Sequence, residues 1–314
     1  MNALRLVYFG TPAFAVPPLH ALLASKHRVL AVVSQPDRPK GRGHQLQATP
    51  TREVAALHDI PVLQPARIKD PAFLQSIRDL APDLGVVAAF GRILPDDLLA
   101  IPRLGMINVH ASVLPRYRGA APIQRAVLAG DEETGVTIMQ MVSELDAGPM
   151  LAVTTVPIAP DATSGDVEAV VAAAGAPLLI RVVDRLSQGT VPATPQDPTL
   201  ATFAPKVTKQ EGAIDWNRPA RDVHNTVRGL QPWPLASTHL DGTRYVIRRT
   251  IIENGTTDRA AGTVVDAHAD RFAVAAGGGT VVRILEIQPE GRRSMAARDF
   301  LAGHHLFPGA SFDT

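Results

Sequence analysis

The sequence contains no cysteine, so disulfide bonds and thiolate metal sites are excluded. It also has no apolar run near the roughly 20 residues that a membrane-spanning helix needs. Nor is there an excess of one charge, because 31 basic residues face 30 acidic ones and the formal net charge is +1. Any binding of nucleic acid must therefore depend on a local basic patch, since no global field attracts phosphates.

Length and composition indicate a globular protein with two domains. At 314 residues the chain is about twice the usual domain size. Its apolar share of 46% is high enough to bury cores, and its charged share of 19% is too low for disorder. The opening MNALRLVYFG enters a strand-like run without the pattern of a targeting segment. We therefore expect a cytoplasmic protein with no membrane partner.

The first half of the chain alternates apolar runs of strand length with helical stretches. The strand-like runs are 4–9, 29–34, 84–89, 106–109 and 136–141, and the helical stretches are 17–25, 50–57, 71–80 and 122–129. Each of those helices opens with proline, where a missing N–H costs nothing. The alternation predicts an α/β domain with a parallel sheet, helices on both faces, and ligands at the carboxyl ends of its strands.

The second half of the chain has a different pattern of predicted helices and strands. A helix over 163–186 is expected to close the first domain, and the proline-rich polar stretch 190–205 is typical of a linker. Beyond it, a helix at 220–229 accompanies short strands separated by turn residues, at 211–215, 236–240, 245–253, 262–267, 272–276 and 280–287. Such spacing predicts a small antiparallel barrel. The predicted domains are therefore 1–189 and 206–314.

A further absence concerns the turn after the first strand, Phe9-Gly10-Thr11-Pro12. The dinucleotide-binding pattern G-x-G-x-x-G is missing, because Pro12 stands where the second glycine is needed. Without that glycine the backbone cannot approach a pyrophosphate closely. A nicotinamide- or flavin-dependent dehydrogenase is therefore disfavoured.

The strongest local signal is the segment 105–119, an apolar strand that runs into Asn108 and His110 and then turns at Pro115. Side chains two positions apart in a strand lie on one face, so the carboxamide and the imidazole project together. An amide N–H beside an imidazole suits the stabilisation of a developing oxyanion. From these residues alone, a hydrogen-bonded core histidine beside a strand-end asparagine remains an open alternative.

Asp146 follows the next predicted strand, within an Asp-x-Gly turn. If the two strands are parallel, Asp146 lies at the same edge of the sheet as Asn108 and His110. A carboxylate there can orient an imidazole or relay a proton, although Asp-x-Gly is also a plain turn. Together the three residues suit acyl transfer to an amine. No serine or cysteine stands out as a nucleophile, so direct transfer is favoured over a covalent enzyme intermediate.

Two loops are candidates for ligand contact. The loop 89–95 contains an aromatic residue, a glycine and a proline, which suits either a flat heterocycle or a tight strand–helix connection. The stretch 35–44 is long for such a connection and places Arg38, Lys40 and Arg42 at alternate positions among Gly and Pro. It suits contact with phosphates, with a solvated surface loop as the alternative.

Together these segments resemble the methionyl-tRNA formyltransferase family. The resemblance covers nearly the whole chain, including the basic loop, and it depends on the stretches 9–12, 108–110, 112–115, 118–122, 145–148 and 232–234. The chain departs from the family pattern at Val113, where leucine is usual. It also lacks, at 141–143, the aspartate that commonly follows the methionine, so no second acid is expected there.

The resemblance implies a Rossmann-like formyltransferase domain followed by an OB-like β-barrel domain. The implied reaction transfers the formyl group of 10-formyltetrahydrofolate, a co-substrate, to methionyl initiator tRNA without a metal. The implied catalytic residues are Asn108, His110 and Asp146. Those implied to bind the folate are Phe90, Gly91, Ile93, Leu94, Ser112, Val113, Leu114 and Pro115, and those implied to contact tRNA are Arg38, Lys40 and Arg42. We further expect a monomer.

Two rival functions remain at this point. A formyltransferase that acts on a small amine, such as an amino sugar nucleotide, would keep Asn108, His110 and Asp146 but would have little use for the basic loop. A pure RNA-binding module is disfavoured by the charge balance of residues 206–314, where 14 basic groups face 12 acidic ones.

Overall fold

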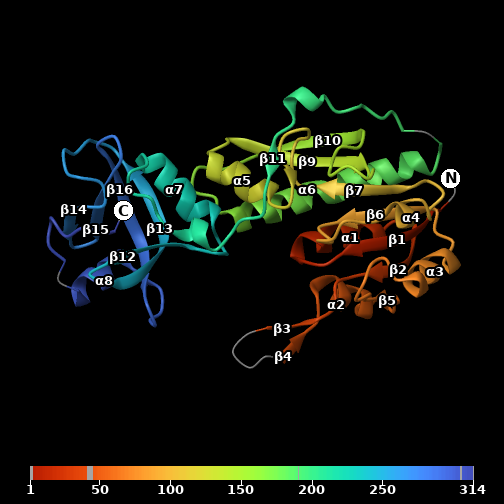
Figure 1. Cartoon of the computed structure of the whole chain (residues 1–314), viewed down its shortest axis with the longest axis horizontal. Coiled ribbons are helices and arrows are strands. Elements are labelled where there is room, and N and C mark those ends of the chain that lie inside the picture. Colours follow the sequence, from red (N-terminus) through yellow and green to blue (C-terminus); the bar gives the residue numbers. More distant parts are fainter. Residues whose placement is uncertain (1–2, 41–44, 190, 305, 314) are drawn as a thin grey trace. The chain divides into compact units, whose positions relative to one another are not determined.

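The computed structural model describes residues 3–40, 45–189, 191–304 and 306–313, and it divides into two compact units (Figure 1). Unit 1 comprises Met1–Pro122, Glu133–Val156 and Glu168–Pro205, and unit 2 comprises Ile123–Glu132, Pro157–Val167 and Lys206–Thr314. Two short stretches of the predicted first domain therefore lie in unit 2. The stretch predicted as a linker, 190–205, lies in unit 1.

Unit 1 is built on a seven-stranded sheet in the order β10-β9-β7-β6-β1-β2-β5. The strands are β1 (Arg5–Gly10), β2 (Arg28–Val33), β5 (Val62–Leu63), β6 (Leu84–Ala88), β7 (Met106–His110), β9 (Glu133–Gln140) and β10 (Met150–Pro157). From β5 to β7 all neighbouring strands are parallel, which confirms that part of the prediction. The chain adds β2 and β5 on one side of β1 and then β6 on the other, so the switch point lies between β1 and β6.

The prediction of a wholly parallel sheet is wrong at β9, which runs antiparallel to β7 and pairs Gln140 with Ile107 and Thr137 with His110. After β7 the chain does not return to the amino ends of the strands before β9 begins. The strand therefore starts beside the end of β7 and runs backwards. Buried apolar runs look alike in both directions, so the sequence pattern does not distinguish them.

The helices of unit 1 are α1 (Val16–Leu23), α2 (Pro50–Leu57), α3 (Pro71–Asp79), α4 (Asp96–Leu99) and most of α6 (Ser164–Leu186). All but α4, which was not predicted, begin within one residue of the predicted start. The Thr49 and Asp70 side chains cap α2 and α3 by accepting backbone N–H groups, and proline follows each cap. Helix α6 approaches the sheet closely at Gly175, where a Cβ would lie 3.2 Å from Val109.

The basic stretch 35–44 includes the first strand of a short hairpin that was not predicted, and the second strand follows directly after it. Its strands are β3 (Arg38–Lys40) and β4 (Gln45–Gln47), with Arg38 opposite Gln47 and Lys40 opposite Gln45. Arg42 falls outside the described residues. Two of the three candidate tRNA contacts therefore lie on one strand of this hairpin.

Unit 2 contains an antiparallel sheet in the order β12-β13-β16-β15-β14, with β17 paired to β16. Its elements are α5 (Pro122–Ala129, shared at its first residue with unit 1), α7 (Ala220–Gly229), β12 (Ala236–Leu240), β13 (Thr243–Glu253), β14 (Val264–His268), β15 (Arg271–Ala276), β16 (Thr280–Pro289), β17 (Met295–Ala296) and α8 (Ala297–Gly303). The strand predicted at 211–215 is wrong. A 3-10 helix, η3 (Gln210–Gly212), occupies its start because the chain turns there to bury Trp216 against Phe312.

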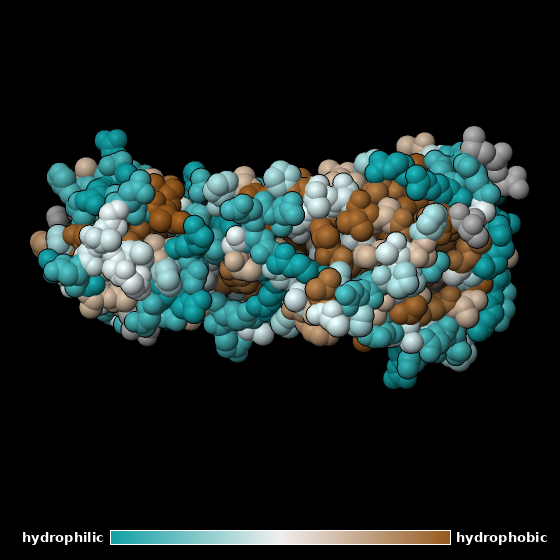
Figure 2. Space-filling view, turned by 90° about the horizontal axis from the view of Figure 1, so that it is seen from above, coloured by the Kyte–Doolittle hydropathy of each residue, from teal (hydrophilic) through white to brown (hydrophobic). Residues whose placement is uncertain are grey.

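Within the described residues no helix combines the length and the apolar character required to cross a bilayer. On the face shown in Figure 2, hydrophobic residues reach the surface in separate patches among hydrophilic ones. The core of unit 1 nearest the switch point contains Phe9, Val87, Phe90, Leu94 and Met106. The loop after β6 is thus anchored from below by its own apolar side chains.

Candidate active site

Three polar side chains meet at the carboxyl end of β7. The Nδ2 of Asn108 donates a long hydrogen bond of 3.5 Å to Oδ1 of Asp146, and Nδ1 of His110 lies 3.6 Å from Oδ2 of the same carboxylate. His110 is 5% exposed and the Asp146 side chain is 13% exposed. The structure therefore brings together the three residues that the sequence selected, in a setting with little solvent.

Asp146 reaches this position by a different route from the one predicted. The strand β9 runs away from the carboxyl end of β7, and the loop 141–149 then brings the chain back beside Asn108 and His110. The expectation that Asp146 joins them is right, but its basis in parallel strands is wrong. Since the loop has no helix or strand of its own, Asp146 must be held by hydrogen bonds.

The imidazole of His110 is held by backbone and not by a carboxylate. Its Nε2 lies 3.0 Å from the carbonyl oxygen of Tyr117. A carbonyl only accepts hydrogen bonds, so Nε2 carries the proton in the neutral ring and Nδ1 is the nitrogen that can take up another. The distance from Nδ1 to Asp146 is too long for a direct hydrogen bond.

Burial lowers the pKa of His110, and the nearby carboxylate of Asp146 and the Tyr117 carbonyl act more weakly in the opposite direction. Loss of hydration disfavours the imidazolium, whereas a negative charge favours it. The net lowering keeps the ring neutral at pH 7. His110 is therefore prepared to accept a proton at Nδ1, beside an anion that would stabilise the resulting cation.

Asp146 has a left-handed backbone with φ of 48°, a conformation that aspartate adopts more readily than most residues. Its Oδ2 accepts the backbone N–H of Gly119 at 2.9 Å. Gly119 itself has φ of 121°, and a Cβ there would lie 2.8 Å from the carbonyl oxygen of Ala204. A side chain at 119 would therefore displace the backbone that presents this N–H to the carboxylate.

A pocket of about 470 Å³ lies at the switch point of the sheet. It is bordered by turns that follow three parallel strands, with Thr11 and Pro12 after β1, Gln35 after β2, and Phe90 and Gly91 after β6. Crevices at such positions are the usual ligand sites of α/β sheets. Because Val87 of β6 pairs with Asn108 of β7, the strand bordering this pocket is the immediate neighbour of the strand carrying the polar cluster.

The residues of the loop 89–95 divide into two groups. Phe90 and Leu94 are buried, and Phe90 contacts Phe9 edge to face with 5.6 Å between ring centroids. Ile93 is 79% exposed, and Gly91 has φ of 78°. The loop therefore offers a ligand Ile93 and the backbone around Gly91, while its aromatic ring mainly holds the loop in place.

The turn 112–115 is similarly divided. Ser112 and Leu114 are buried, while Val113 and Pro115 are partly exposed. The Ser112 hydroxyl donates to the carbonyl oxygen of Arg116 at 2.6 Å, and its own carbonyl accepts from Thr137 at 2.7 Å. Ser112 and Leu114 thus fix the turn, and Val113 and Pro115 are the members left to meet a ligand.

Among the candidate tRNA contacts, Arg38 is the one whose side chain the structure describes. Arg38 is exposed, borders the switch-point pocket, and donates to Oε1 of Gln35 at 3.2 Å. Lys40 is on the same strand of the hairpin, and Arg42 lies outside the described residues.

Sequence reasoning missed four contributors to the site: the Tyr117 carbonyl, the Gly119 N–H, and the side chains of Arg118 and Gln196. The backbone groups carry no signal in a sequence. Arg118 stood within the segment that carried the family resemblance, but nothing predicted that its guanidinium would be buried. Gln196 lies in the stretch taken for a linker and had no signal.

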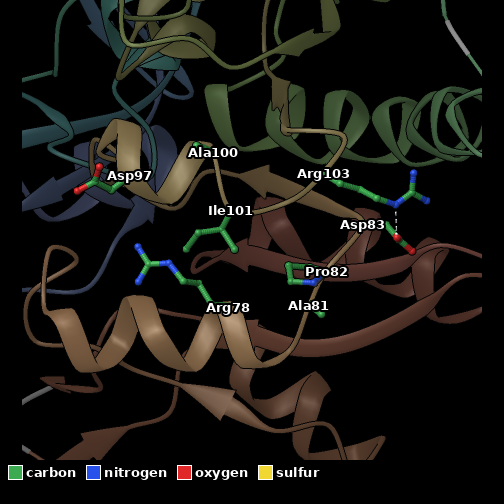
Figure 3. A pocket seen from close by; sticks show the side chains of 8 residues that line it. All are labelled: Arg78, Ala81, Pro82, Asp83, Asp97, Ala100, Ile101 and Arg103. Atoms are coloured by element: carbon green, nitrogen blue, oxygen red, sulfur yellow. Dashed lines mark hydrogen bonds and ion pairs between the residues drawn. The ribbon is translucent and has the colours of Figure 1, made fainter.

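No group of three or more His, Asp or Glu residues in the described parts of the chain is arranged to hold a metal ion. A second pocket, of about 610 Å³, lies at the opposite edge of the sheet, where Asp83 and Arg103 precede β6 and β7. There the Arg103 Nε donates to Asp83 at 2.6 Å, as Figure 3 shows. This pocket faces the amino ends of the strands, away from the polar cluster.

An α/β sheet whose carboxyl edge combines an amide, an imidazole and a carboxylate beside a switch-point pocket is typical of a group-transferring enzyme. The chain belongs to the formyl transferase family: residues 4–183 match the family model described as formyl transferase. Residues 206–305 match the model of the formyl transferase C-terminal domain.

Curated relatives resemble the chain over nearly its whole length. The methionyl-tRNA formyltransferase of Pelobacter propionicus is 48% identical over 98% of this chain and 96% of its own length. That of Moorella thermoacetica is 44% identical, over 98% of both chains.

Solved structures share the fold at low identity. An N-formyltransferase from Helicobacter canadensis, in complex with folinic acid and dTDP-3-aminofucose, matches with a TM-score of 0.69 at 17% identity, over 92% of this chain and all of that one. HypX from Aquifex aeolicus with tetrahydrofolic acid gives 0.66 at 15% identity, over all of this chain and 51% of that one. At such identities the likeness concerns the fold alone.

Proposed function

We propose that this enzyme transfers the formyl group of 10-formyltetrahydrofolate to the α-amino group of methionyl initiator tRNA. Relatives at 44–48% identity over nearly the full length carry the name methionyl-tRNA formyltransferase. The observation that carries the proposal in this chain is the meeting of Asn108, His110 and Asp146 at one strand end.

Each of these residues has a role that follows from its atoms. The folate supplies a formyl carbon bound to nitrogen, and attack by the methionine amine places negative charge on the formyl oxygen. An Asn108 N–H donates to that oxygen, since the carboxamide carries two such groups and only one faces Asp146. The neutral His110 accepts a proton from the attacking amine at Nδ1, and the Asp146 carboxylate stabilises the imidazolium until the leaving nitrogen takes the proton.

The folate is proposed to lie against the loops 90–94 and 112–115. Ile93, Gly91, Val113 and Pro115 would contact it directly, because these are the residues that reach the surface among those implied to bind the folate. Phe90, Leu94, Ser112 and Leu114 would support the site from below. A turn with fixed backbone groups and a few apolar side chains suits a flat heterocycle.

Contacts with tRNA are proposed for Arg38, Lys40 and Arg42 and for the C-terminal domain. Arg38 borders the switch-point pocket, and basic residues at alternate positions of the sequence suit the phosphates of an acceptor end. For residues 206–314 we keep the proposal of an OB-like barrel, supported by the antiparallel order of the sheet. The division into domains 1–189 and 206–314, a monomeric state and a cytoplasmic location remain part of the proposal.

The deciding experiment incubates the protein with 10-formyltetrahydrofolate and methionyl initiator tRNA and measures formyl-methionine released from the tRNA. We expect transfer to the initiator and little to methionyl elongator tRNA, with an amino sugar nucleotide as the small-amine comparison. Transfer to the amino sugar nucleotide without transfer to the tRNA would establish the rival function instead.

A further inference from the structure

The segment 191–205, here named the strap, crosses unit 1 after helix α6 and is held at both of its ends. Near its start, Thr194 and Met150 exchange backbone hydrogen bonds of 2.8 Å. Near its end, β11 (Phe203–Ala204) pairs in parallel with β8 (Arg118–Gly119). The strap is therefore part of the sheet region that carries the active site, although its proline-rich polar composition is that of a linker.

Gln196 lies between these two anchors, and its carboxamide reaches the loop that carries Asp146. Its Nε2 donates to the backbone carbonyls of Asp146 and Gly148, both at 2.8 Å. Its Oε1 accepts from Nε of Arg118 at 3.0 Å. The Gln196 side chain thus connects the buried guanidinium of Arg118 with two backbone carbonyls of the loop that carries Asp146.

The loop of Asp146 depends on such bonds. Residues 142–145 are all exposed, and Asp146 has a left-handed backbone. The side-chain oxygens of Asp146 accept hydrogen bonds from the backbone N–H of Gly119 and from the carboxamide of Asn108. The Gln196 bonds act on the backbone of the same residue, and therefore decide where the carboxylate sits relative to Nδ1 of His110.

Arg118 extends the arrangement. It is 5% exposed, and besides Gln196 it contacts the carboxylate of Glu144, which lies on the exposed loop, at 3.4 Å. Its own backbone pairs with the strap. The guanidinium fixes the Gln196 amide in the orientation that presents its NH₂ group to the loop, because a guanidinium only donates.

We propose that Gln196 is a positioning residue for formyl transfer, which holds the Asp146 carboxylate beside His110 with Arg118 fixing its amide. The proposal rests on the function proposed above for the same site. Displacement of a catalytic group by about 1 Å can lower the rate by about 10²-fold. Loss of a side chain that holds such a group should therefore lower turnover more than substrate binding.

The first test compares turnover of Gln196→Ala with wild type at saturating concentrations of both substrates. We expect kcat to fall by about 10- to 100-fold, while the KM for the folate changes less than about twofold, because the hydrogen bonds of Gln196 go to Arg118, Asp146 and Gly148 and not to the candidate folate loops. The matched control is Asp197→Ala, one residue along the strap. It removes the acceptor for the Thr199 N–H and hydroxyl at the start of the short helix η2 (Pro198–Leu200) and should leave kcat near that of wild type.

A second variant keeps the test valid if Gln196→Ala does not fold. Gln196→Glu has nearly the same volume and keeps the acceptor for Arg118, but it loses the donor to the two carbonyls. It should unfold near the wild-type temperature and still lose kcat. Wild-type turnover in Gln196→Glu would overturn the proposal.

A double-mutant cycle separates positioning from mere structural support. If Gln196 acts through Asp146, then Gln196→Ala should cost little further activity in an Asp146→Ala background. The proposal would be refuted if Gln196→Ala lowered kcat by the same factor in both backgrounds. It would also be refuted if kcat of the Gln196→Ala single variant stayed within about twofold of wild type.

The His110 imidazole gives a readout that does not require formyl transfer. Because the Asp146 charge raises the pKa of His110, displacing Asp146 should lower it in Gln196→Ala, as followed by NMR titration. If the protein formylated no tRNA, the proposed function would be wrong. The NMR titration of His110 would still report whether Gln196 positions Asp146. An unchanged His110 pKa in Gln196→Ala would contradict the proposal.

Discussion

At the scale of single residues, Asn108 and Asp146 are the groups whose loss should affect the chemistry most directly. We expect Asn108→Ala and Asp146→Ala each to lower the single-turnover rate by about 10²-fold or more, since each removes an oxyanion donor or a proton-transfer partner. Thermal unfolding should change little, because neither side chain fills the core. A variant that kept most of its single-turnover rate would refute the role assigned to that residue.

The titration of His110 provides a second residue-scale prediction. Burial lowers its pKa below the usual value of about 6.5, and the Asp146 charge opposes that lowering. In Asp146→Asn the pKa should therefore fall further, which an NMR titration of the imidazole would measure. A rise in Asp146→Asn would show that the carboxylate does not act on this ring.

The same shift has a consequence for stability. In the window between the folded pKa and about 6.5, the unfolded chain holds a proton on His110 that the folded chain lacks. Lowering the pH through this window therefore reduces the free energy of unfolding. His110→Gln should remove this part of the pH dependence, as measured by urea unfolding at pH 7 and at pH 5.

At the scale of elements, the turn of Asp146 depends on Gly148. A Cβ on Gly148 would lie 1.8 Å from the carbonyl oxygen of Gln140, which is backbone and cannot move aside alone. Gly148→Ala should therefore shift the loop, lower the unfolding temperature and reduce turnover by about 10²-fold. As a control, Gly303→Ala places its Cβ in open space and should alter neither. Normal turnover in Gly148→Ala would show that the loop tolerates the shift.

The hairpin β3–β4 yields the prediction that separates tRNA recognition from the small-amine rival. Replacing Arg38, Lys40 and Arg42 by Ala should weaken use of tRNA severely and affect folate binding far less, since Arg38 borders the pocket that Gly91 shares but lies on neither candidate folate loop. Each charge removed should flatten the log–log salt dependence of tRNA binding by roughly one unit. Kinetic constants for both substrates test this, with wild-type protein at the same salt concentrations as the reference. Unchanged tRNA kinetics would remove the hairpin from recognition.

Local patterns were enough to predict most elements, and the reasons are visible in particular residues. The alternation in β7 predicted that Asn108 and His110 share a face, and the prolines at 50 and 71 marked two helix starts. The direction of β9 could not be predicted, because a buried strand has no polarity in its composition. Gln196 could not be predicted either, since its partners lie 48 to 78 residues away and no periodicity connects them.

At the scale of the whole molecule, unit 2 includes segments from the middle of the chain. The Arg228 guanidinium donates to the carbonyl oxygen of Ala162 at 3.2 Å, and the hydroxyl of Ser164 donates to the carbonyl oxygen of Gly229 at 2.7 Å. His224 lies 3.1 Å from the carbonyl oxygen of Pro160. The Arg228 guanidinium also donates to the carbonyl oxygen of Val127 in α5 at 3.5 Å. Residues 157–167 and α5 therefore depend on α7 for buried polar contacts.

This dependence predicts the behaviour of fragments. A fragment of residues 1–189 loses both the strap and α7, so its unfolding temperature should be well below that of the full chain and it should lack transfer activity. A fragment of residues 1–205 regains the strap but not α7, and should bind folate better than 1–189. Calorimetry and folate titration would measure both. Equal stability of 1–189 and the full chain would show that 157–167 and α5 do not need α7.

The strap also sets an order of events during synthesis on the ribosome. Gln196 is made 50 residues after Asp146, whose carbonyl it binds. At about 5–20 residues per second, Asp146 leaves the ribosome roughly 2.5–10 seconds before the side chain that holds its loop, and Asn108 and His110 leave earlier still. A nascent chain can thus form the sheet from β1 to β9 while its catalytic geometry is still incomplete. The enzyme becomes competent only when translation has passed well beyond its catalytic residues.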